Sequence, residues 1–585
     1  MIQTKDVHKQ FANYFKNENL KPYLYLISKG LSEGHICLDI NTIDFKELEE
    51  EGFSKLISTE ELRKQELVSE GSDYKPLVLW KNKLYLQRYF AYETQVFEKI
   101  QNWIQTEKEW ESVRMEELKK EKIRIEELFP SSSTNRVDWQ LVAALTAVLN
   151  QFTIITGGPG TGKTTTVAKV LSVLYHLNPD LKVALAAPTG KAAARMAESL
   201  KNLQHIDSDT KLHFESLEPS TIHRLLGYQK NSIYFKHNAE NPIPHDLVII
   251  DESSMIDIAL FAKLVNSIRP ETKIILLGDK DQLASVEAGS LFGDLCMAQP
   301  KLNQFSSNRA EFFNQFISNE NQKIPVENTQ ESGHLLFEHS VELQFSHRFS
   351  DDEGIGQLSK AILRNEKDSI LKFFNNQDGR VEVDTNYSEE IFHDFIKGFE
   401  AYIREKDIKK AFEKLNQLRI LCAIREGEEG IYILNDRVQK FLQSKGLIHL
   451  DSPFYEHRPL IVNTNNYELG LFNGDIGIVR KDEEGVLKVW FEGADGELKS
   501  ILPAFIDSAE TVFAMTIHKS QGSEFGKVMV VLPQSADIPL LTKELLYTAV
   551  TRAKEKVIIQ GSKEGILTCA ERRVQRGSGI MDRFK

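Results

Sequence analysis

Residues Gly157 to Thr165 read GGPGTGKTT, and this stretch decides the fold of the chain. It fits the spacing G-x-x-x-x-G-K-[ST], in which a glycine-rich turn brings backbone N–H groups and a helix N-terminus close to phosphate oxygens. Lys163 is expected to reach the β- and γ-phosphates, and the Thr164 hydroxyl to hold Mg²⁺. The full set predicted to bind ATP here is Gly157, Gly158, Pro159, Gly160, Thr161, Gly162, Lys163, Thr164 and Thr165.

The flanks of this stretch have the context that the motif needs. The apolar, β-branched run at 152–156 is typical of a buried parallel strand. After the glycines, Val167, Val170, Leu171 and Leu174 recur at the spacing of one helix face. The glycines therefore lie in a strand-to-helix turn, and a ligand-free glycine-rich turn is a poor alternative.

Composition narrows the class of protein. A chain of 585 residues is expected to hold three to four domains, at about 150 residues each. The net charge of −13 argues against a generic binder of polyanions, although a local basic groove can sit on an acidic protein. The four cysteines lie far apart without metal-type pairing, and no apolar run suits a membrane span, so we expect a reduced cytoplasmic protein.

The pattern of apolar, polar and turn residues changes along the chain and divides it into several units. We predict a mainly helical N-terminal domain at 1–125, a first core at 126–340 and a second core at 341–585. Within the second core, turn signals between short β-type runs predict a small antiparallel barrel inserted at 447–505. The polar stretch at 298–335 is expected to be a mobile surface segment. Strands alternating with helices in both cores predict an α/β fold with parallel sheets.

A pair of carboxylates, Asp251 and Glu252, follows the apolar run at 247–250. In a parallel sheet the residues just after a strand lie at the ligand-binding edge. Asp251 is expected to position Mg²⁺, and Glu252 to orient and deprotonate the water that attacks the γ-phosphate. Downstream of a phosphate-binding loop, this pair is strong evidence for ATP hydrolysis.

Two arginines, Arg348 and Arg552, lie in compact polar motifs that we assign to the second core. Phosphoryl transfer needs positive charge on the γ-phosphate oxygens in the transition state. Insertion of these arginines across a cleft would make hydrolysis depend on closure of the two cores, with Arg552 the stronger candidate. The alternative for each is a surface salt bridge, which contributes little.

The ordered motifs resemble those of superfamily 1 DNA helicases, in the 5′-to-3′ branch (superfamily 1B). Within that superfamily, SEGHICLDI (32–40), PLVLWKNKLYLQRYFAYE (76–93) and RPLIVNTNNYELGLFNGDIGIV (458–479) resemble the RecD family, the alpha subunits of exodeoxyribonuclease V. The shared motifs are Gln140, GGPGTGKTT (157–165), APTGKAAARM (187–196), STIHRLL (220–226), IIDESSMID (249–257), LLGDKDQLASVEAGS (276–290), HRF (347–349), TIHKSQGSEF (516–525) and YTAVTRAK (547–554).

The resemblance implies further roles. It implies two RecA-like domains with an SH3-like inserted barrel, contact of Gln140 with adenine, and sensing of the γ-phosphate by Gln282. It also implies RecB-like and RecC-like partner subunits and a single-stranded or tailed duplex DNA substrate. The residues it places along DNA are Thr189, Gly190, Lys191, Thr221, His223, Thr516, His518, Lys519, Ser520 and Gln521. Their types suit phosphate and sugar contacts, which position a strand without reading its sequence.

Other functions remain open at this stage. A self-sufficient helicase would share the chemistry but unwind DNA without partners. A small-molecule kinase would not need the second core, and a structural subunit without ATPase activity would not need Lys163, Asp251 or Arg552. No Asp-x-Lys carboxylate cluster is evident, so any DNA cutting by the complex is expected to occur in a partner subunit.

Overall fold

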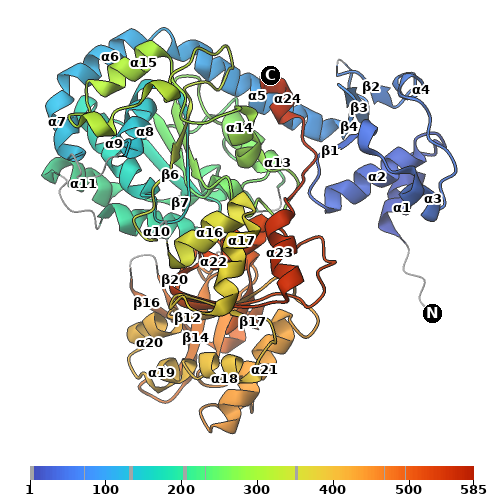
Figure 1. The fold of residues 1–585 in the computed structure, drawn as a ribbon, viewed down its shortest axis with the longest axis vertical. Helices are drawn as coiled ribbons and strands as arrows, with labels where there is room; N and C mark the ends of the chain where they lie inside the picture. The colour runs from blue at the N-terminus through green and yellow to red at the C-terminus, as the bar shows by residue number, and fades with distance from the viewer. Residues whose placement is uncertain are drawn as a thin grey trace.

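The computed structural model describes residues 6–71, 73–130, 136–201, 207–230, 232–349, 353–466, 468–493 and 496–585. Two α/β cores lie one above the other, and a smaller N-terminal unit projects to one side (Figure 1). The chain ends beside the first core rather than beside the second core, from which its last segment emerges.

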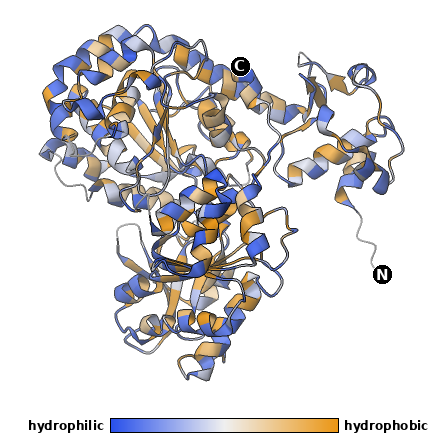
Figure 2. Cartoon of the chain, viewed as in Figure 1, coloured by the Kyte–Doolittle hydropathy of each residue, from blue (hydrophilic) through white to orange (hydrophobic). Residues whose placement is uncertain are grey.

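The first core is a six-stranded sheet in the order β10-β5-β9-β8-β6-β7, and every pairing in it is parallel. Its strands are β5 (Phe152–Gly157), β6 (Val183–Ala187), β7 (Ser220–Thr221), β8 (Leu247–Ile250), β9 (Lys273–Gly278) and β10 (Ser340–Leu343). Side chains of a strand alternate between the two faces, so Ile155 packs in one apolar cluster and Phe152 and Ile154 in the other. The apolar strands stand out at the centre of this core in Figure 2.

Helices cover both faces of the first sheet. One face packs against α8 (Trp139–Leu149), α9 (Lys163–Leu177) and α15 (Ser307–Asn314). The other face packs against α13 (Ile258–Asn266), α14 (Leu291–Ala298) and the long α5 (Gln87–Glu107), whose Trp103 stacks on Phe152 at 6.1 Å between ring centroids.

The second core is a five-stranded sheet in the order β11-β20-β19-β12-β18, again entirely parallel. Its strands are β11 (Val381–Asp384), β12 (Leu418–Cys422), β18 (Ala514–Thr516), β19 (Phe525–Val531) and β20 (Ala553–Gln560). The helices α16 (Gly354–Arg364), α21 (Ile431–Ser444) and α22 (Lys543–Val550) pack around it. The prediction of an α/β fold with parallel sheets is confirmed in both cores.

The insert in the second core is a five-stranded antiparallel sheet in the order β16-β15-β14-β13-β17. The strands are β13 (Pro459–Val462), β14 (Ile476–Lys481), β15 (Leu487–Glu492), β16 (Leu498–Ile501) and β17 (Ala509–Thr511). They surround an apolar cluster of their own that includes Leu460, Val479 and Phe491. The antiparallel insert is present, it reaches beyond residue 505, and its closure into an SH3-like barrel stays a prediction.

The N-terminal unit is smaller than predicted and combines its helices with a small sheet. Its helices are α1 (Val7–Tyr14), α2 (Lys21–Ser32), α3 (Phe45–Glu50) and α4 (Thr59–Arg63), and its four-stranded sheet holds β1 (Cys37–Asp39), β2 (Val68–Ser69), β3 (Leu77–Trp80) and β4 (Lys83–Leu86). The unit ends near residue 86, because α5, α6 (Glu111–Lys120) and α7 (Lys122–Leu128) pack on the first core.

Two further boundaries differ from the sequence-based expectation. The strand β10, expected to open the second core, pairs with β5 and forms an edge of the first sheet. The stretch at 298–335 is not a loose surface segment, because Phe305, Phe312, Phe313 and Phe316 are buried in the first core.

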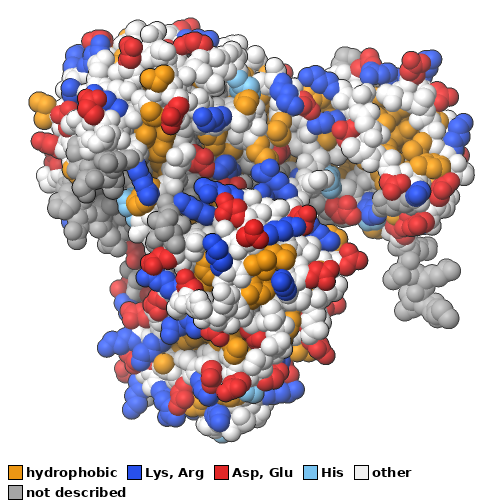
Figure 3. All heavy atoms as spheres, viewed as in Figure 1, with side chains coloured by type: hydrophobic (Ala, Val, Ile, Leu, Met, Phe, Trp, Pro, Cys, Tyr) orange, Lys and Arg blue, Asp and Glu red, His pale blue; other side chains and the backbone are white. Residues whose placement is uncertain are grey.

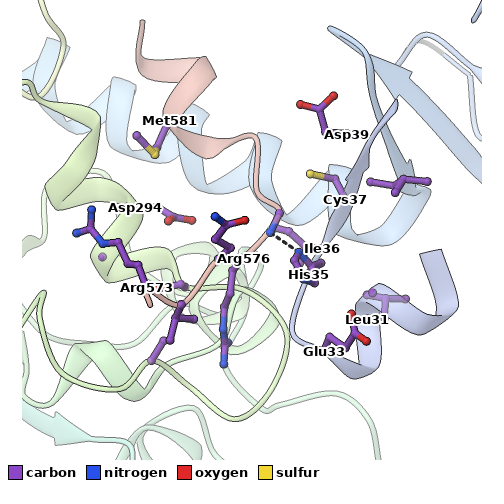
Figure 4. A pocket seen from close by; sticks show the side chains of 18 of the residues that line it. Leu31, Glu33, His35, Ile36, Cys37, Asp39, Asp294, Arg573, Arg576 and Met581 are labelled. Atoms are coloured by element: carbon purple, nitrogen blue, oxygen red, sulfur yellow. Dashed lines mark hydrogen bonds between the residues drawn. The ribbon is translucent and has the colours of Figure 1, made fainter. Parts of the chain in front are cut away.

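Residues 572–585, the C-terminal strap, return from the second core to the first core and the N-terminal unit. The Gly577 carbonyl accepts the N–H of Ile36 at 2.8 Å, and the Gly577 N–H donates to His35 Nδ1 at 2.7 Å (Figure 4). At its end, α24 (Ile580–Phe584) packs on α5 and α14, and Arg583 pairs with the buried Glu93 at 3.2 Å. The strap, the N-terminal unit and the first core together line a cavity of about 510 Å³.

Candidate nucleotide and DNA site

The phosphate loop, residues 157–165, joins the end of β5 to the start of α9, as predicted. Gly160 and Gly162 have φ angles of 77° and 86°, a backbone region that favours glycine. A Cβ at Gly162 would also lie 2.3 Å from Gln140 Nε2. The turn therefore depends on glycine both for its backbone and for the close approach of a neighbouring side chain. Thr164 and Thr165 lie in the first turn of α9.

Lys163 folds back into this loop. Its ammonium donates to the carbonyl of Gly157 at 2.6 Å and to that of Gly158 at 3.3 Å. Gln140, at the start of α8, donates from Nε2 to the Thr161 carbonyl at 3.0 Å. Both side chains thus lie at the loop where the sequence places a nucleotide, and the adenine contact of Gln140 stays a prediction.

Asp251 and Glu252 follow β8 at the carboxyl edge of the sheet. Glu252 has a left-handed backbone, with φ 51°, and its N–H donates to Asp251 Oδ1 at 2.8 Å. Burial and the neighbouring Glu252 carboxylate raise the pKa of Asp251 to about 6, while the positive charge of Lys163 opposes the shift. The carboxylate of Asp251 and the hydroxyl of Thr164 are hard oxygen donors of the kind that Mg²⁺ prefers, so these residues fit the predicted ion.

Gln282 lies at the carboxyl edge of the same sheet, four residues after β9. Its Nε2 donates to Asp279 Oδ2 at 2.9 Å, and the side chain is buried. Its Oε1 is also buried and meets no hydrogen-bond donor among the residues that the structure describes.

Arg348 is held directly over the phosphate loop. The N–H of His347 donates to the Gly160 carbonyl at 2.8 Å, and Ser346 Oγ donates to the Pro159 carbonyl at 3.0 Å. Arg348 follows β10, so it lies on the connection that leaves the first sheet and not inside the second core, which corrects the sequence-based prediction. Its Nη1 is buried and has no hydrogen-bond partner in the described part of the chain.

Arg552 does belong to the second core, immediately before β20. It is 3% exposed, and it donates from Nε to the Thr548 carbonyl and from Nη1 to the Ser523 carbonyl, both at 3.2 Å. Burial lowers the pKa of Arg552, whereas the negative charges of Glu252, Glu524 and Asp279 act in the opposite direction. Carboxylates of both cores thus act on the charge of this guanidinium.

The predicted DNA residues of the first core lie at the starts of short helices. Thr189 Oγ1 accepts the N–H of Ala192, and Thr221 Oγ1 accepts the N–H of Arg224, each at 3.2 Å. His223 is exposed on the surface and meets the ring of Phe235 edge-on.

The residues Gly190 and Lys191 adjoin the inserted sheet, because a Cβ at Gly190 would lie 3.7 Å from the ring of Phe472. Burial, together with the charges of Arg195 and Arg419, lowers the pKa of Lys191 to about 7.

The predicted DNA residues of the second core divide into two kinds. His518 and Lys519 are partly exposed, and Lys519 Nζ donates to Asn463 Oδ1 at 2.7 Å. Thr516 is 8% exposed, Ser520 is fully buried, and Gln521 donates across to the Leu283 carbonyl of the first core at 2.7 Å. The structure therefore places Ser520 and Gln521 within protein contacts. On the face in view, basic side chains gather along the junction of the two cores (Figure 3).

Several residues at this site had no role assigned from the sequence. Glu524 binds Arg348, Asp279 orients Gln282, and Arg195 donates to the Gly522 carbonyl at 2.6 Å. Each lies inside a recognised motif, so a signal existed, but the sequence does not say which partner a side chain meets.

Two kinds of feature are absent from the described residues. Within the ranges given above, no helix has the length and apolarity needed to cross a membrane. In the same ranges, no three His, Cys, Asp or Glu side chains gather closely enough to hold a metal ion.

Comparison with known proteins gives concordant matches. The family model for the N-terminal domain of RecBCD enzyme subunit RecD matches residues 6–85, an AAA domain model matches 140–288, and the UvrD-like helicase C-terminal domain model matches 511–560.

Whole-chain comparison points the same way. The RecBCD enzyme subunit RecD of Mycobacterium tuberculosis is 36% identical over 469 residues, which cover 78% of this chain and 74% of the relative. That of Buchnera aphidicola subsp. Acyrthosiphon pisum is 30% identical and covers 92% and 91%. The ATP-dependent RecD2 DNA helicase of Deinococcus radiodurans is 29% identical, over 74% of this chain but only 50% of that protein. With this agreement on both cores and the N-terminal unit, the chain belongs to the RecD family and is an ATP-dependent DNA helicase.

Proposed function

We propose that the chain is the 5′-to-3′ motor subunit of a RecB–RecC–RecD-like exodeoxyribonuclease V that processes DNA ends during double-strand break repair and degrades linear duplex DNA. Its partners are RecB-like and RecC-like subunits, and it moves along the single-stranded tail of a duplex. The nuclease residues lie in a partner subunit. The four described cysteines are buried free thiols, which supports a cytoplasmic location.

The observation that supports this proposal is that side chains of both cores meet beside the phosphate loop. Arg348 lies on the phosphate loop and is bound to Glu524 of the second core, and Arg552 lies near Glu252 of the first. Loss of the γ-phosphate removes the negative charge that these cations face. Each cycle therefore changes the attraction between the cores, which can open and close over a DNA strand.

The residues of the chain divide the chemistry among them. Lys163 and the loop N–H groups bind the phosphates, and Glu252 accepts the proton of the attacking water. Thr164 and Asp251 would hold Mg²⁺, which when bound supplies further positive charge on the β- and γ-phosphates. Arg348 and Arg552 stabilise the charge that develops in the transition state.

The second candidate is a self-sufficient helicase that unwinds DNA without partner subunits. The match of residues 6–85 to the RecD N-terminal domain favours the subunit, since a dedicated N-terminal unit on an acidic chain suits docking on larger partners.

The experiment is ATP hydrolysis by the purified chain with and without single-stranded DNA, using Lys163→Gln as the inactive control. Duplexes with a 5′ or a 3′ tail report the direction of unwinding in the same samples. DNA-stimulated hydrolysis with unwinding from 5′ tails alone supports the motor and its direction. Strong unwinding without partners favours the self-sufficient helicase, and hydrolysis that ignores DNA contradicts an autonomous motor.

A further inference from the structure

Tyr547 reaches out of the second core to the phosphate loop of the first. It lies in α22 and is only 5% exposed. Its hydroxyl donates to Asp279 Oδ2 at 3.1 Å, and a Cβ at Gly158 would lie 2.7 Å from the hydroxyl oxygen. The phenol therefore fills the space between the phosphate loop and the strand end that carries Asp279.

Asp279 accepts three hydrogen bonds. Its Oδ1 accepts the N–H of Asp281 at 3.0 Å, and its Oδ2 accepts both Tyr547 and Gln282 Nε2. It is 2% exposed, so each of these bonds is made out of contact with bulk water. A carboxylate has only acceptor atoms, which forces Gln282 to turn its NH₂ group towards Asp279.

The consequence lies on the other side of the Gln282 amide. Its carbonyl oxygen points away from Asp279, is buried, and meets no donor in the described ranges. A buried acceptor without a partner is costly, on the order of 1–3 kcal/mol. A water molecule can supply the missing donor. The predicted place of Gln282 beside the γ-phosphate makes the attacking water the candidate for that donor.

The second core fixes the neighbouring backbone as well. The Leu283 N–H donates to Thr548 Oγ1 at 3.0 Å, and the Leu283 carbonyl accepts from Gln521 Nε2 at 2.7 Å. Three bonds from the second core thus converge on residues 279–283, and Tyr547 is the one that acts on the side chain which orients Gln282.

We infer that Tyr547 is a positioning residue for ATP hydrolysis. Its hydroxyl holds Asp279, Asp279 fixes the Gln282 amide, and the free Gln282 carbonyl oxygen orients the attacking water. The arrangement is complete only while the second core is closed on the first. The rate of ATP hydrolysis therefore depends on closure of the two cores. This inference rests on the proposed ATP-driven motor and adds a residue to its mechanism.

The test compares Tyr547→Phe with Tyr455→Phe in the full-length chain. The control also removes a buried tyrosine hydroxyl of the second core, one that donates to Gln439 Oε1 at 2.8 Å away from the nucleotide. Tyr547→Phe is expected to lower kcat about 10- to 100-fold, the range for one hydrogen bond to a charged group, with KM for ATP changed less than about twofold. Tyr455→Phe is expected to keep the wild-type kcat.

A double variant shows whether Tyr547 acts through Asp279. In an Asp279→Asn background, adding Tyr547→Phe is expected to lower kcat by no more than about twofold, because the relay is already broken. A wild-type kcat for Tyr547→Phe, a change confined to KM, or losses that multiply in the double variant would each overturn the inference. Absence of ATP hydrolysis by the wild-type chain, in a folded sample that binds ATP, would instead contradict the proposed motor, and the inference about Tyr547 would fall with it.

Discussion

Arg348 Nη2 lies 2.6 Å from Glu524 Oε1, and this ion pair ties the segment that leaves the first sheet to the second core directly over the phosphate loop. Burial works against ionisation of Glu524, but the charges of Arg348, Arg195 and Lys554 bring its pKa down to about 2. The Glu524 carboxylate therefore stays ionised at neutral pH. It holds one guanidinium nitrogen of Arg348, and Nη1 has no hydrogen-bond partner among the described residues, so we predict that Nη1 binds a phosphate oxygen.

Loss of Arg348 is expected to lower the rate of ATP hydrolysis more than loss of the Glu524 charge. Arg348→Ala deletes a charge on the γ-phosphate, and kcat should fall by about 10³-fold or more. Glu524→Gln keeps that charge but loosens its orientation, so a loss of about 10-fold is expected. Steady-state ATP hydrolysis with saturating single-stranded DNA measures both, and an equal loss in the two variants would contradict an orienting role for Glu524.

The ionised carboxylate of Asp251 is predicted to destabilise the folded first core, although ATP hydrolysis requires it. Its folded pKa of about 6 exceeds the ordinary value of 3.8, so the folded state retains the proton that the unfolded state releases. The cost is absent below pH 3.8, grows as the pH rises and is complete above pH 6. Asp251→Asn should therefore stabilise the first core at pH 8 by on the order of 1–3 kcal/mol and abolish hydrolysis.

Calorimetry without nucleotide or Mg²⁺ checks this prediction. At pH 4 the two proteins should melt alike. A melting temperature for Asp251→Asn at pH 8 that lies below the wild-type value would show that the carboxylate is not strained by its surroundings.

Lys191 is predicted to make DNA binding sensitive to pH. Because its folded pKa is lowered to about 7, its amine loses the proton as the pH rises above 7, and with it the charge that attracts a phosphate. Affinity for single-stranded DNA should fall between pH 7 and pH 9. Lys191→Arg, which stays charged, should remove this part of the pH dependence.

Fluorescence titrations at fixed salt would show this difference. Lys191→Met should also lower the slope of log affinity against log salt by about 0.7, the value for one phosphate contact on a single strand. An unchanged slope would place Lys191 off the DNA path.

Glu93 is predicted to hold the C-terminal strap in place. It is fully buried and accepts the Gly579 N–H at 2.8 Å and the Arg583 guanidinium at 3.2 Å. Glu93→Ala would leave Arg583 buried without its counter-charge, which costs about 3–5 kcal/mol. Hydrogen exchange of the Ile36 amide, bonded to Gly577, should accelerate about 100-fold or more.

An exposed ion pair provides the control for the strap. Lys367 and Glu571 lie 3.1 Å apart with half or more of each side chain in solvent, so Glu571→Ala should change exchange very little. Equal exchange in the wild type and Glu93→Ala would show that the strap does not depend on this carboxylate.

The sequence predicted the strands and loops that carry the chemistry, because in a parallel sheet a short apolar run followed at once by Gly, Asp or Lys is a local signal. It did not predict which sheet an edge strand joins, so β10 was assigned to the wrong core. The polar stretch at 298–335 hid four buried phenylalanines, since its average composition masks single apolar side chains. The amphipathic pattern of α5 gives an apolar face but does not name the surface that covers it.

Contacts between residues far apart in the chain were out of reach of local patterns. Nothing near Tyr547 indicates that its hydroxyl meets Asp279, and nothing near Ile36 indicates a bond to Gly577. Such pairs follow from how whole domains are oriented relative to one another. No short sequence pattern encodes that orientation.

The C-terminal strap also constrains the order of events during synthesis. The N-terminal unit leaves the ribosome before both cores and can fold early, but the residues that bind His35, Ile36 and Glu93 lie beyond the entire second core. Until residues 572–585 emerge, the N-terminal unit is held only by its own contacts with the first core. A nascent chain interrupted within the second core thus carries an unfastened N-terminal unit, and the protein reaches its final shape only after both motor cores have been translated.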